Sequence, residues 1–196
     1  MKECVVIDGV RSANARAHKD KGWFRNVRPE DLLIEVYRAL FKRNPKVKPE
    51  DVEAVFCGTA NQAGMQNDIA RLAWLAGGFP ENVASNGINQ QCPSGMAATE
   101  HAARAILCGE GDIFVASGVE DMQKVPMMFA MDMHPKIFER YFMGDLPMGN
   151  TAEKVARLWN VNRKDAEVMA YWSHKKAAAS RDAGKFDNEI VPIEGE

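Results

Sequence analysis

Residues 89–98 read Asn-Gln-Gln-Cys-Pro-Ser-Gly-Met-Ala-Ala and join a short apolar run to an alanine-rich one. The run before them, residues 83–88, has the length of a strand, and residues 94–107 have the length and composition of a helix that a glycine ends. Pro93 suits the first position of that helix, where its missing N–H costs no hydrogen bond. The stretch therefore predicts a strand–turn–helix unit with Cys92 at the turn.

Cys92 is the residue of this turn whose side chain can act as a nucleophile. At the cap position of the helix, its sulfur faces unpaired N–H groups and the positive end of the helix dipole, both of which favour a thiolate. The thiolate is the attacking form of a catalytic cysteine. A buried cysteine on a core helix explains the same pattern equally well, so the residues alone leave both interpretations open.

A cysteine nucleophile needs a base, and the four histidines offer no convincing partner. His101 lies on the same predicted helix, but at about 100° and 1.5 Å per residue it points away from Cys92. His18 and His174 lie in polar surroundings typical of solvated side chains, and His134 stays open in a methionine-rich loop. The chain therefore looks like half of an active site.

Strands and helices alternate on both sides of this unit. Further strands are predicted at residues 4–8, 53–57 and 112–116, and further helices at residues 29–43 and 68–75. This alternation predicts an α/β fold with a buried, mostly parallel sheet.

The composition changes after residue 121. Residues 122–148 hold seven of the eleven methionines, and two helices follow, the second capped by Asn162. We therefore predict two domains, a core of residues 1–121 and a mostly helical lobe of residues 122–196. Thioether side chains suit an aliphatic acyl chain, although loop packing or a subunit contact explains most of these methionines better.

Composition also restricts partners and compartment. The 196 residues carry 25 Lys and Arg against 27 Asp and Glu, a net charge of −2, which argues against nucleic-acid and anionic-membrane partners. No run approaches 18 apolar residues, so we expect no membrane span. The four cysteines lack metal-site spacing, so we expect no metal, no disulfide framework and a cytoplasmic protein.

Residues 89–98 resemble the nucleophile motif of the thiolases, in which an asparagine precedes the acyl-accepting cysteine by three residues, as Asn89 precedes Cys92. The resemblance extends from Val5 to Pro192. Other matching segments, in the family's order, are Val6-Ile7-Asp8 with Arg11-Ser12, Val119-Glu120-Asp121-Met122 with Val125-Pro126-Met127, Met148-Gly149-Asn150-Thr151-Ala152-Glu153, Ser173-His174-Lys175-Lys176-Ala177, Gly184-Lys185-Phe186 and Glu189-Ile190-Val191-Pro192. Residues 24–31 and His134-Pro135 are more similar to the fatty-acid-degrading 3-ketoacyl-CoA thiolases than to the acetoacetyl-CoA type.

The resemblance implies the thiolase-like layered fold, of which this chain would hold the N-terminal half and an incomplete CoA-binding loop domain. It implies an acyltransferase in which Cys92 attacks a 3-ketoacyl-CoA, acetyl-CoA leaves, and coenzyme A, the co-substrate, takes the acyl group from the cysteine. The Cys92 N–H would help to stabilise an oxyanion, and Met148 would contact the substrate in the pantetheine tunnel. No bound cofactor is implied.

Length is the largest departure from the family pattern. Thiolases run to roughly twice this length, and their Asn-Glu-Ala-Phe, Gly-His-Pro and Cys-x-Gly motifs do not occur in this sequence. Pro93 follows the nucleophile where a small residue is usual, which the start of a helix tolerates. We therefore expect a second polypeptide with the C-terminal-half motifs to complete the site, in a heterotetramer or larger assembly.

Three other interpretations remain open. A non-catalytic acyl-CoA-binding or scaffolding subunit would keep the same fold, although the intact Asn89 and Cys92 favour catalysis. An acetoacetyl-CoA thiolase acting in the condensation direction is disfavoured by Pro147, since many such enzymes have histidine there. The sequence also fits part of a longer thiolase chain.

Overall fold

The computed structural model describes residues 3–195 and divides the chain into two compact units. The first unit runs to Ala130 and resumes at Glu189, and the second is Met131–Asn188. The boundary predicted after residue 121 falls inside the first unit, and a functional division at that point stays a prediction.

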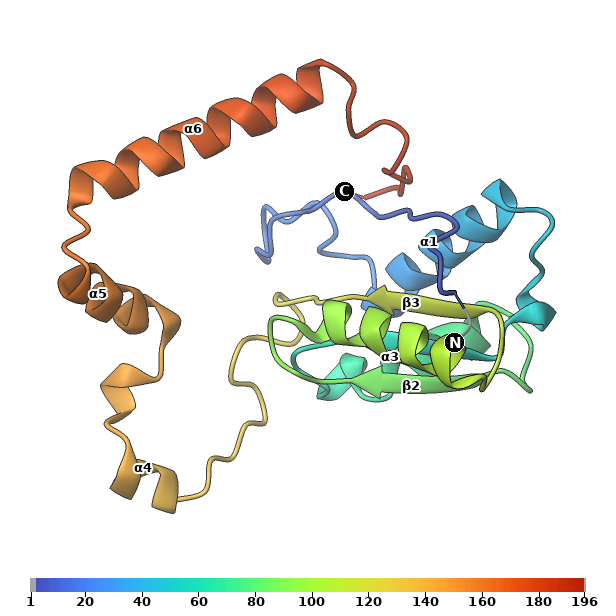
Figure 1. Cartoon of the computed structure of the whole chain (residues 1–196), viewed down its shortest axis with the longest axis horizontal. Helices are drawn as coiled ribbons and strands as arrows, with labels where there is room; N and C mark the ends of the chain where they lie inside the picture. The colour runs from blue at the N-terminus through green and yellow to red at the C-terminus, as the bar shows by residue number, and fades with distance from the viewer. Residues whose placement is uncertain (1–2, 196) are drawn as a thin grey trace. The chain divides into compact units, whose positions relative to one another are not determined.

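A three-stranded parallel sheet lies at the centre of the first unit (Figure 1). Its strands are β1 (Ala54–Gly58), β2 (Ala84–Ile88) and β3 (Phe114–Gly118), in the order β2-β1-β3. Gly58 pairs with Ile88 on one side and with Gly118 on the other, so the carboxyl ends of all three strands are level at one edge. The predicted α/β fold with a parallel sheet is confirmed.

Helices cover both faces of this sheet. They are α1 (Pro29–Arg43), α2 (Ile69–Ala76) and α3 (Ser94–Cys108), with short 3₁₀ turns η1 (Pro49–Asp51) and η2 (Gly64–Gln66) in the connections. The bounds of α1 agree with the sequence prediction, because Pro29 opens the helix and the acidic first turn and basic last turn both suit its dipole.

Side-chain alternation along β1 decides which helix covers which face. Val55 and Cys57 are fully buried in a core with α1 and α2, whose Tyr37 and Trp74 rings meet edge to face at 5.7 Å. Phe56 points to the opposite face, where its ring stacks on that of His101 in α3 at 5.8 Å. His101 is thus occupied in packing on the sheet.

Residues 4–8 were predicted as a strand, and this prediction was wrong. They lie outside the sheet, and Val6 is 84% exposed. Asp8 instead anchors the segment to the end of α1, since its carboxylate accepts hydrogen bonds of 2.9 Å from both Asn44 and Arg43. The Asn44 amide, the Gly9 N–H and the Arg43 charge lower the pKa of this carboxyl group. β-Propensity alone therefore does not place this segment beside β3.

The second unit consists of α4 (Lys136–Arg140), η3 (Met143–Asp145), α5 (Met148–Leu158) and α6 (Arg163–Asp182). Asn162 caps α6 as predicted, accepting the Asp165 N–H at 3.0 Å. None of the described residues of this unit is buried, although it carries Trp159 and Trp172. No described helix combines the length and apolar composition that crossing a membrane requires.

Candidate active site

Cys92 lies in the turn between β2 and α3, at the edge where the strands end, with its side chain exposed. The sequence placed Cys92 at the helix cap and Pro93 in the first turn, and this was wrong by one residue. Pro93 is itself the cap, because its carbonyl accepts the Ala97 N–H at 2.9 Å, and α3 begins at Ser94. Cys92 precedes the cap and still lies at the amino end of the helix.

Asn89 shapes the turn that carries Cys92. Its side-chain oxygen accepts the N–H of Gln91 at 3.0 Å, two residues along the chain. Such a bond replaces a backbone turn bond and supports local conformations outside helix and strand. Gln91 adopts one of these, with φ +58° in the left-handed region that residues with a side chain seldom occupy. The residue immediately before Cys92 is therefore held in a strained conformation.

The first turn of α3 packs directly on the end of β1. A Cβ atom placed on Gly58 would overlap the backbone of Ser94 and Gly95. Only glycine lets the helix approach the strand this closely. Gly58 therefore fixes how near to the sheet edge the turn with Cys92 lies.

Three backbone donors lie unused at and just before the amino end of α3. Within the described residues, the N–H groups of Cys92, Gly95 and Met96 donate to no acceptor. At the amino end of a helix such groups stabilise negative charge. The arrangement combines an exposed thiol with donors for an anion, which suits nucleophilic attack on a carbonyl carbon.

The other three thiols lie in different surroundings. Cys57 is buried, and burial raises the pKa of its thiol. Cys4 is half-buried, and Cys108 is exposed at the last position of α3. In the described part of the chain, no three His, Cys, Asp or Glu side chains are grouped to hold a metal ion.

Met148, the second residue singled out from the sequence, is the first residue of α5 in the second unit and is 73% exposed. The start of this helix is tied to the preceding segment by two side chains. Asn150 donates to the Gly144 carbonyl at 2.5 Å, and Thr151 donates to the Asp145 carbonyl at 3.1 Å. Asn150 and Thr151 thus give the Met148 turn a defined local shape.

The family model described as "Thiolase, N-terminal domain" matches residues 4–196. The chain belongs to the thiolase family. Among its relatives, the 3-ketoacyl-CoA thiolase of Marinomonas sp. (strain MWYL1) is 40% identical over 194 residues, which are 98% of this chain and 49% of the relative. The 3-ketoacyl-CoA thiolase of Shewanella frigidimarina (strain NCIMB 400) is 39% identical over 196 residues, covering 100% of this chain and 50% of the relative.

A solved structure supports the thiolase fold independently. The Bacillus anthracis acetyl-CoA acetyltransferase is similar with a TM-score of 0.79 and 32% identity, over 94% of this chain and 49% of that one. The chain therefore has the N-terminal half of the thiolase fold, as expected. It spans about half the length of the thiolases that it matches.

The two histidines of the first unit of this thiolase half make contacts that do not involve Cys92. In the first unit, His101 stacks on Phe56, and the ring nitrogen Nδ1 of His18 accepts the N–H groups of Asp20 and Lys21 at 3.1 and 3.2 Å. His134 and His174 belong to the second unit. The expectation that His101 is no partner for Cys92 agrees with its stacking on the sheet.

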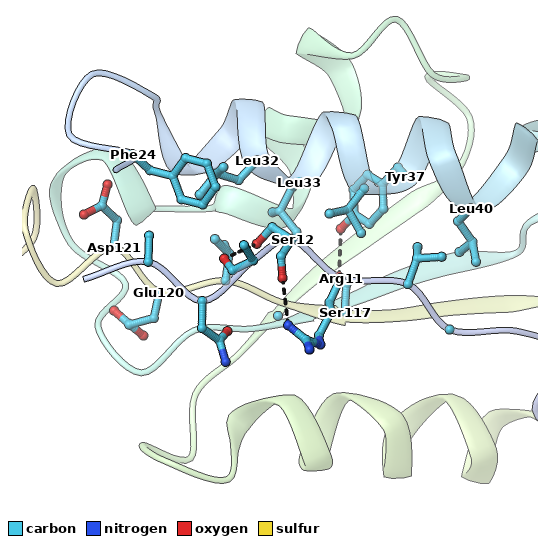
Figure 2. A pocket seen from close by; sticks show the side chains of 18 of the residues that line it. Arg11, Ser12, Phe24, Leu32, Leu33, Tyr37, Leu40, Ser117, Glu120 and Asp121 are labelled. Carbon is cyan, nitrogen blue, oxygen red and sulfur yellow. Dashed lines mark hydrogen bonds between the residues drawn. The ribbon is translucent and has the colours of Figure 1, made fainter. Parts of the chain in front are cut away.

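Two of the hollows in the first unit lie beside the amino-terminal segment, and neither of these is lined by Cys92. One, of about 510 Å³, lies between residues 8–17, α1 and the end of β3 (Figure 2). The other, of about 360 Å³, lies between residues 4–8, α3 and β3. Both lie between the amino-terminal segment and β3, and the segment is not part of the sheet.

Residues 119–122, one of the segments that resemble the thiolases, hold together the loops at the carboxyl edge of the sheet. Glu120 accepts the Ala60 N–H at 2.6 Å and the Gln66 side-chain amide at 2.7 Å, and Gln66 in turn accepts the Asp121 N–H at 2.6 Å. The sequence analysis missed Gln66, which is fully buried. No signal in the sequence points to this contact, because Gln66 and Glu120 lie 54 residues apart in the chain.

Proposed function

We propose that this chain is the nucleophile-bearing component of a 3-ketoacyl-CoA thiolase, acting through an acyl-Cys92 intermediate. The observation that carries the proposal is the exposed thiol at the amino end of α3 beside its own unbonded N–H, within a match to the thiolase N-terminal domain. The names of the relatives support the 3-ketoacyl-CoA substrate class.

In the proposed reaction, the Cys92 thiolate attacks the 3-keto carbon and forms a C–S bond. The C2–C3 bond then breaks, its electron pair leaves as the enolate of acetyl-CoA, and a proton converts the enolate to acetyl-CoA. Coenzyme A attacks the acyl-Cys92 thioester, which releases the shortened acyl-CoA and regenerates the thiolate. The Cys92 N–H stabilises the oxyanion formed at the attacked carbon, and Met148 contacts the pantetheine arm.

We further propose that a thiolase C-terminal half, on a second polypeptide, supplies the acid–base groups. His18 and His101, the two histidines of the first unit, are engaged in other contacts and so are not available to protonate the enolate. The unburied second unit, with its exposed tryptophans, supports association with a further protein surface. Such an interface would be of the obligate kind, above roughly 2,000 Å², in a heterotetramer or larger assembly.

The intermediate is tested by mass spectrometry after incubation with an acyl-CoA, comparing this chain with the variants Cys92→Ser and Cys108→Ser. We expect an acyl adduct on Cys92 that Cys92→Ser abolishes, because a hydroxyl without a strong base is a far weaker nucleophile. Cys108→Ser is the matched control, since it removes an exposed thiol at the opposite end of α3. Bound CoA without an adduct would instead favour a scaffolding subunit.

The need for a second half is tested by measuring 3-ketoacyl-CoA cleavage with this chain alone and with a polypeptide carrying the Gly-His-Pro and Cys-x-Gly segments. Light scattering reports the mass of each sample. We expect cleavage and a stable complex only in the mixture. A soluble, active monomer of this chain by itself would refute the split site.

A further inference from the structure

The backbone that carries Cys92 is held from the helix side by Ser94. The Ser94 hydroxyl donates to the Gln91 carbonyl at 2.5 Å and accepts the Gln90 N–H at 2.9 Å. The Ser94 N–H donates to the same Gln91 carbonyl at 3.1 Å. Ser94 is only 3% exposed, so little water competes for these bonds. One buried side chain thus joins the first residue of α3 to both residues that precede the nucleophile.

Both polar groups of the strained Gln91 backbone are therefore bound. Asn89 holds its N–H, and Ser94 holds its carbonyl with two donors. A left-handed residue with a side chain persists only where its surroundings determine it. These bonds are the local restraints that keep Gln91 at φ +58°.

The Gln91 carbonyl and the Cys92 N–H belong to one peptide group. Because that group is planar and trans, the two bonds point in opposite directions, and fixing one fixes the other. Ser94 binds the carbonyl, while the Cys92 N–H donates to no acceptor within the described residues. The bonds to Ser94 therefore orient the unused Cys92 N–H away from Ser94.

We infer that Ser94 is a positioning residue, which orients the Cys92 N–H for the oxyanion of the proposed reaction and does not itself touch the substrate. The inference rests on the proposed function, since it assumes that Cys92 receives the acyl group. Loss of the hydroxyl removes two of the bonds that hold the turn and leaves the backbone N–H of residue 94 as the one donor to the Gln91 carbonyl, so the peptide group before Cys92 is held less firmly. The oxyanion then loses an oriented donor, while the thiol stays where reagents reach it.

Ser94→Ala is the test variant, and Ser85→Ala is its matched control. The Ser85 hydroxyl on β2 is also buried, but it has no hydrogen-bond partner within the described residues. Each variant is combined with the same C-terminal-half polypeptide. Two rates are measured for Cys92, namely acylation by an acyl-CoA and alkylation by iodoacetamide. Acylation forms an oxyanion at a carbonyl carbon, whereas alkylation displaces iodide and forms none.

For Ser94→Ala we expect acylation to slow by about 10–100-fold with KM nearly unchanged. Alkylation should stay within about threefold of the unsubstituted chain, because it needs only an accessible thiolate. Ser85→Ala should change neither rate, and Ser94→Thr, which keeps the hydroxyl, should restore most of the acylation rate. Equal acylation in Ser94→Ala and the unsubstituted chain would overturn the inference.

Two further outcomes have distinct meanings. Parallel loss of acylation and alkylation in Ser94→Ala would show that the residue supports folding of the turn in general, which also overturns the inference. Absence of any acyl adduct on the unsubstituted chain would overturn the proposed function, and the role of Ser94 with it.

Discussion

The hydroxyl of Tyr37 lies 2.7 Å from the hydroxyl of Ser117, a hydrogen bond that joins α1 to β3 inside the core (Figure 2). Ser117 also donates to the Phe56 carbonyl at 3.3 Å, so the proton between the two hydroxyls belongs to Tyr37. Tyr37 is 1% exposed, and burial raises the pKa of its phenol. Cys57, whose thiol pKa is raised by the same cause, lies in the same core.

Removing the two hydroxyls in turn should have unequal effects on stability. Ser117→Ala leaves the buried Tyr37 hydroxyl with only the weakly accepting sulfur of Cys57 as a partner, which should lower the free energy of unfolding by about 1–3 kcal/mol. Tyr37→Phe removes the donor and leaves Ser117 bonded to Phe56, which should cost about 1 kcal/mol. Urea unfolding of both variants and of the double variant measures the difference. Equal costs for the two single variants would contradict this account of the bond.

Stability should fall at alkaline pH because of Cys57 and Tyr37. Both groups have a raised pKa in the folded state, so above about pH 8.5 for cysteine and pH 10 for tyrosine the unfolded chain releases protons that the folded chain retains. The contribution of these two groups to the free energy of unfolding is therefore complete below those pH values and decreases as the pH rises above them. Urea midpoints between pH 7 and pH 10 measure it.

Cys57→Ala provides the control for that pH dependence. It lowers stability at every pH through the lost packing of a fully buried side chain. It should also flatten the decrease above about pH 8.5, because one group no longer ionises on unfolding. An unchanged slope would mean that the decrease comes from other groups.

The sequence predicted the elements with strong local signals and missed those that depend on tertiary contacts. The end residues of α1 carry proline and charge signals, and its bounds were predicted correctly. Residues 4–8 have high β-propensity, but they lie outside the sheet, and Asp8 binds the end of α1. The Cys92 turn was predicted, but the bonds of Ser94 to Gln90 and Gln91 require knowledge of how the backbone bends. A small polar residue at a helix start was the only signal for them.

The exposed thiols at the two ends of α3, Cys92 just before it and Cys108 at its last position, offer a direct test of how the helix affects reactivity. Cys92 precedes the amino end, where backbone N–H groups are unbonded, and Cys108 is the last residue of the helix, beside its last carbonyl groups. We expect iodoacetamide to label Cys92 first near neutral pH and Cys57 only after unfolding. Peptide mapping over time measures the order. Faster labelling of Cys108 would contradict the predicted effect of the helix.

Met148→Ala should weaken substrate binding more than it slows the chemistry of the proposed thiolase. The expected result is a raised KM for the 3-ketoacyl-CoA with kcat nearly unchanged. Met169→Ala on α6 is the matched control, because Met169 is 77% exposed against 73% for Met148. A collapse of kcat at constant KM would assign Met148 to the orientation of the transition state instead.

Gly58→Ala should disturb the Cys92 turn through the packing of α3 on β1. The new methyl group would overlap the backbone of Ser94 and Gly95, and backbone atoms cannot move aside as a flexible side chain can. We expect a loss of about 1–3 kcal/mol in the free energy of unfolding and a slower acylation of Cys92. Gly95→Ala is the control on the other side of the same contact, since its Cβ would meet nothing within 4 Å. That change should stabilise α3 by up to about 1 kcal/mol. If urea unfolding showed Gly58→Ala and Gly95→Ala both to be neutral, the close approach of α3 to β1 would not determine the position of the Cys92 turn.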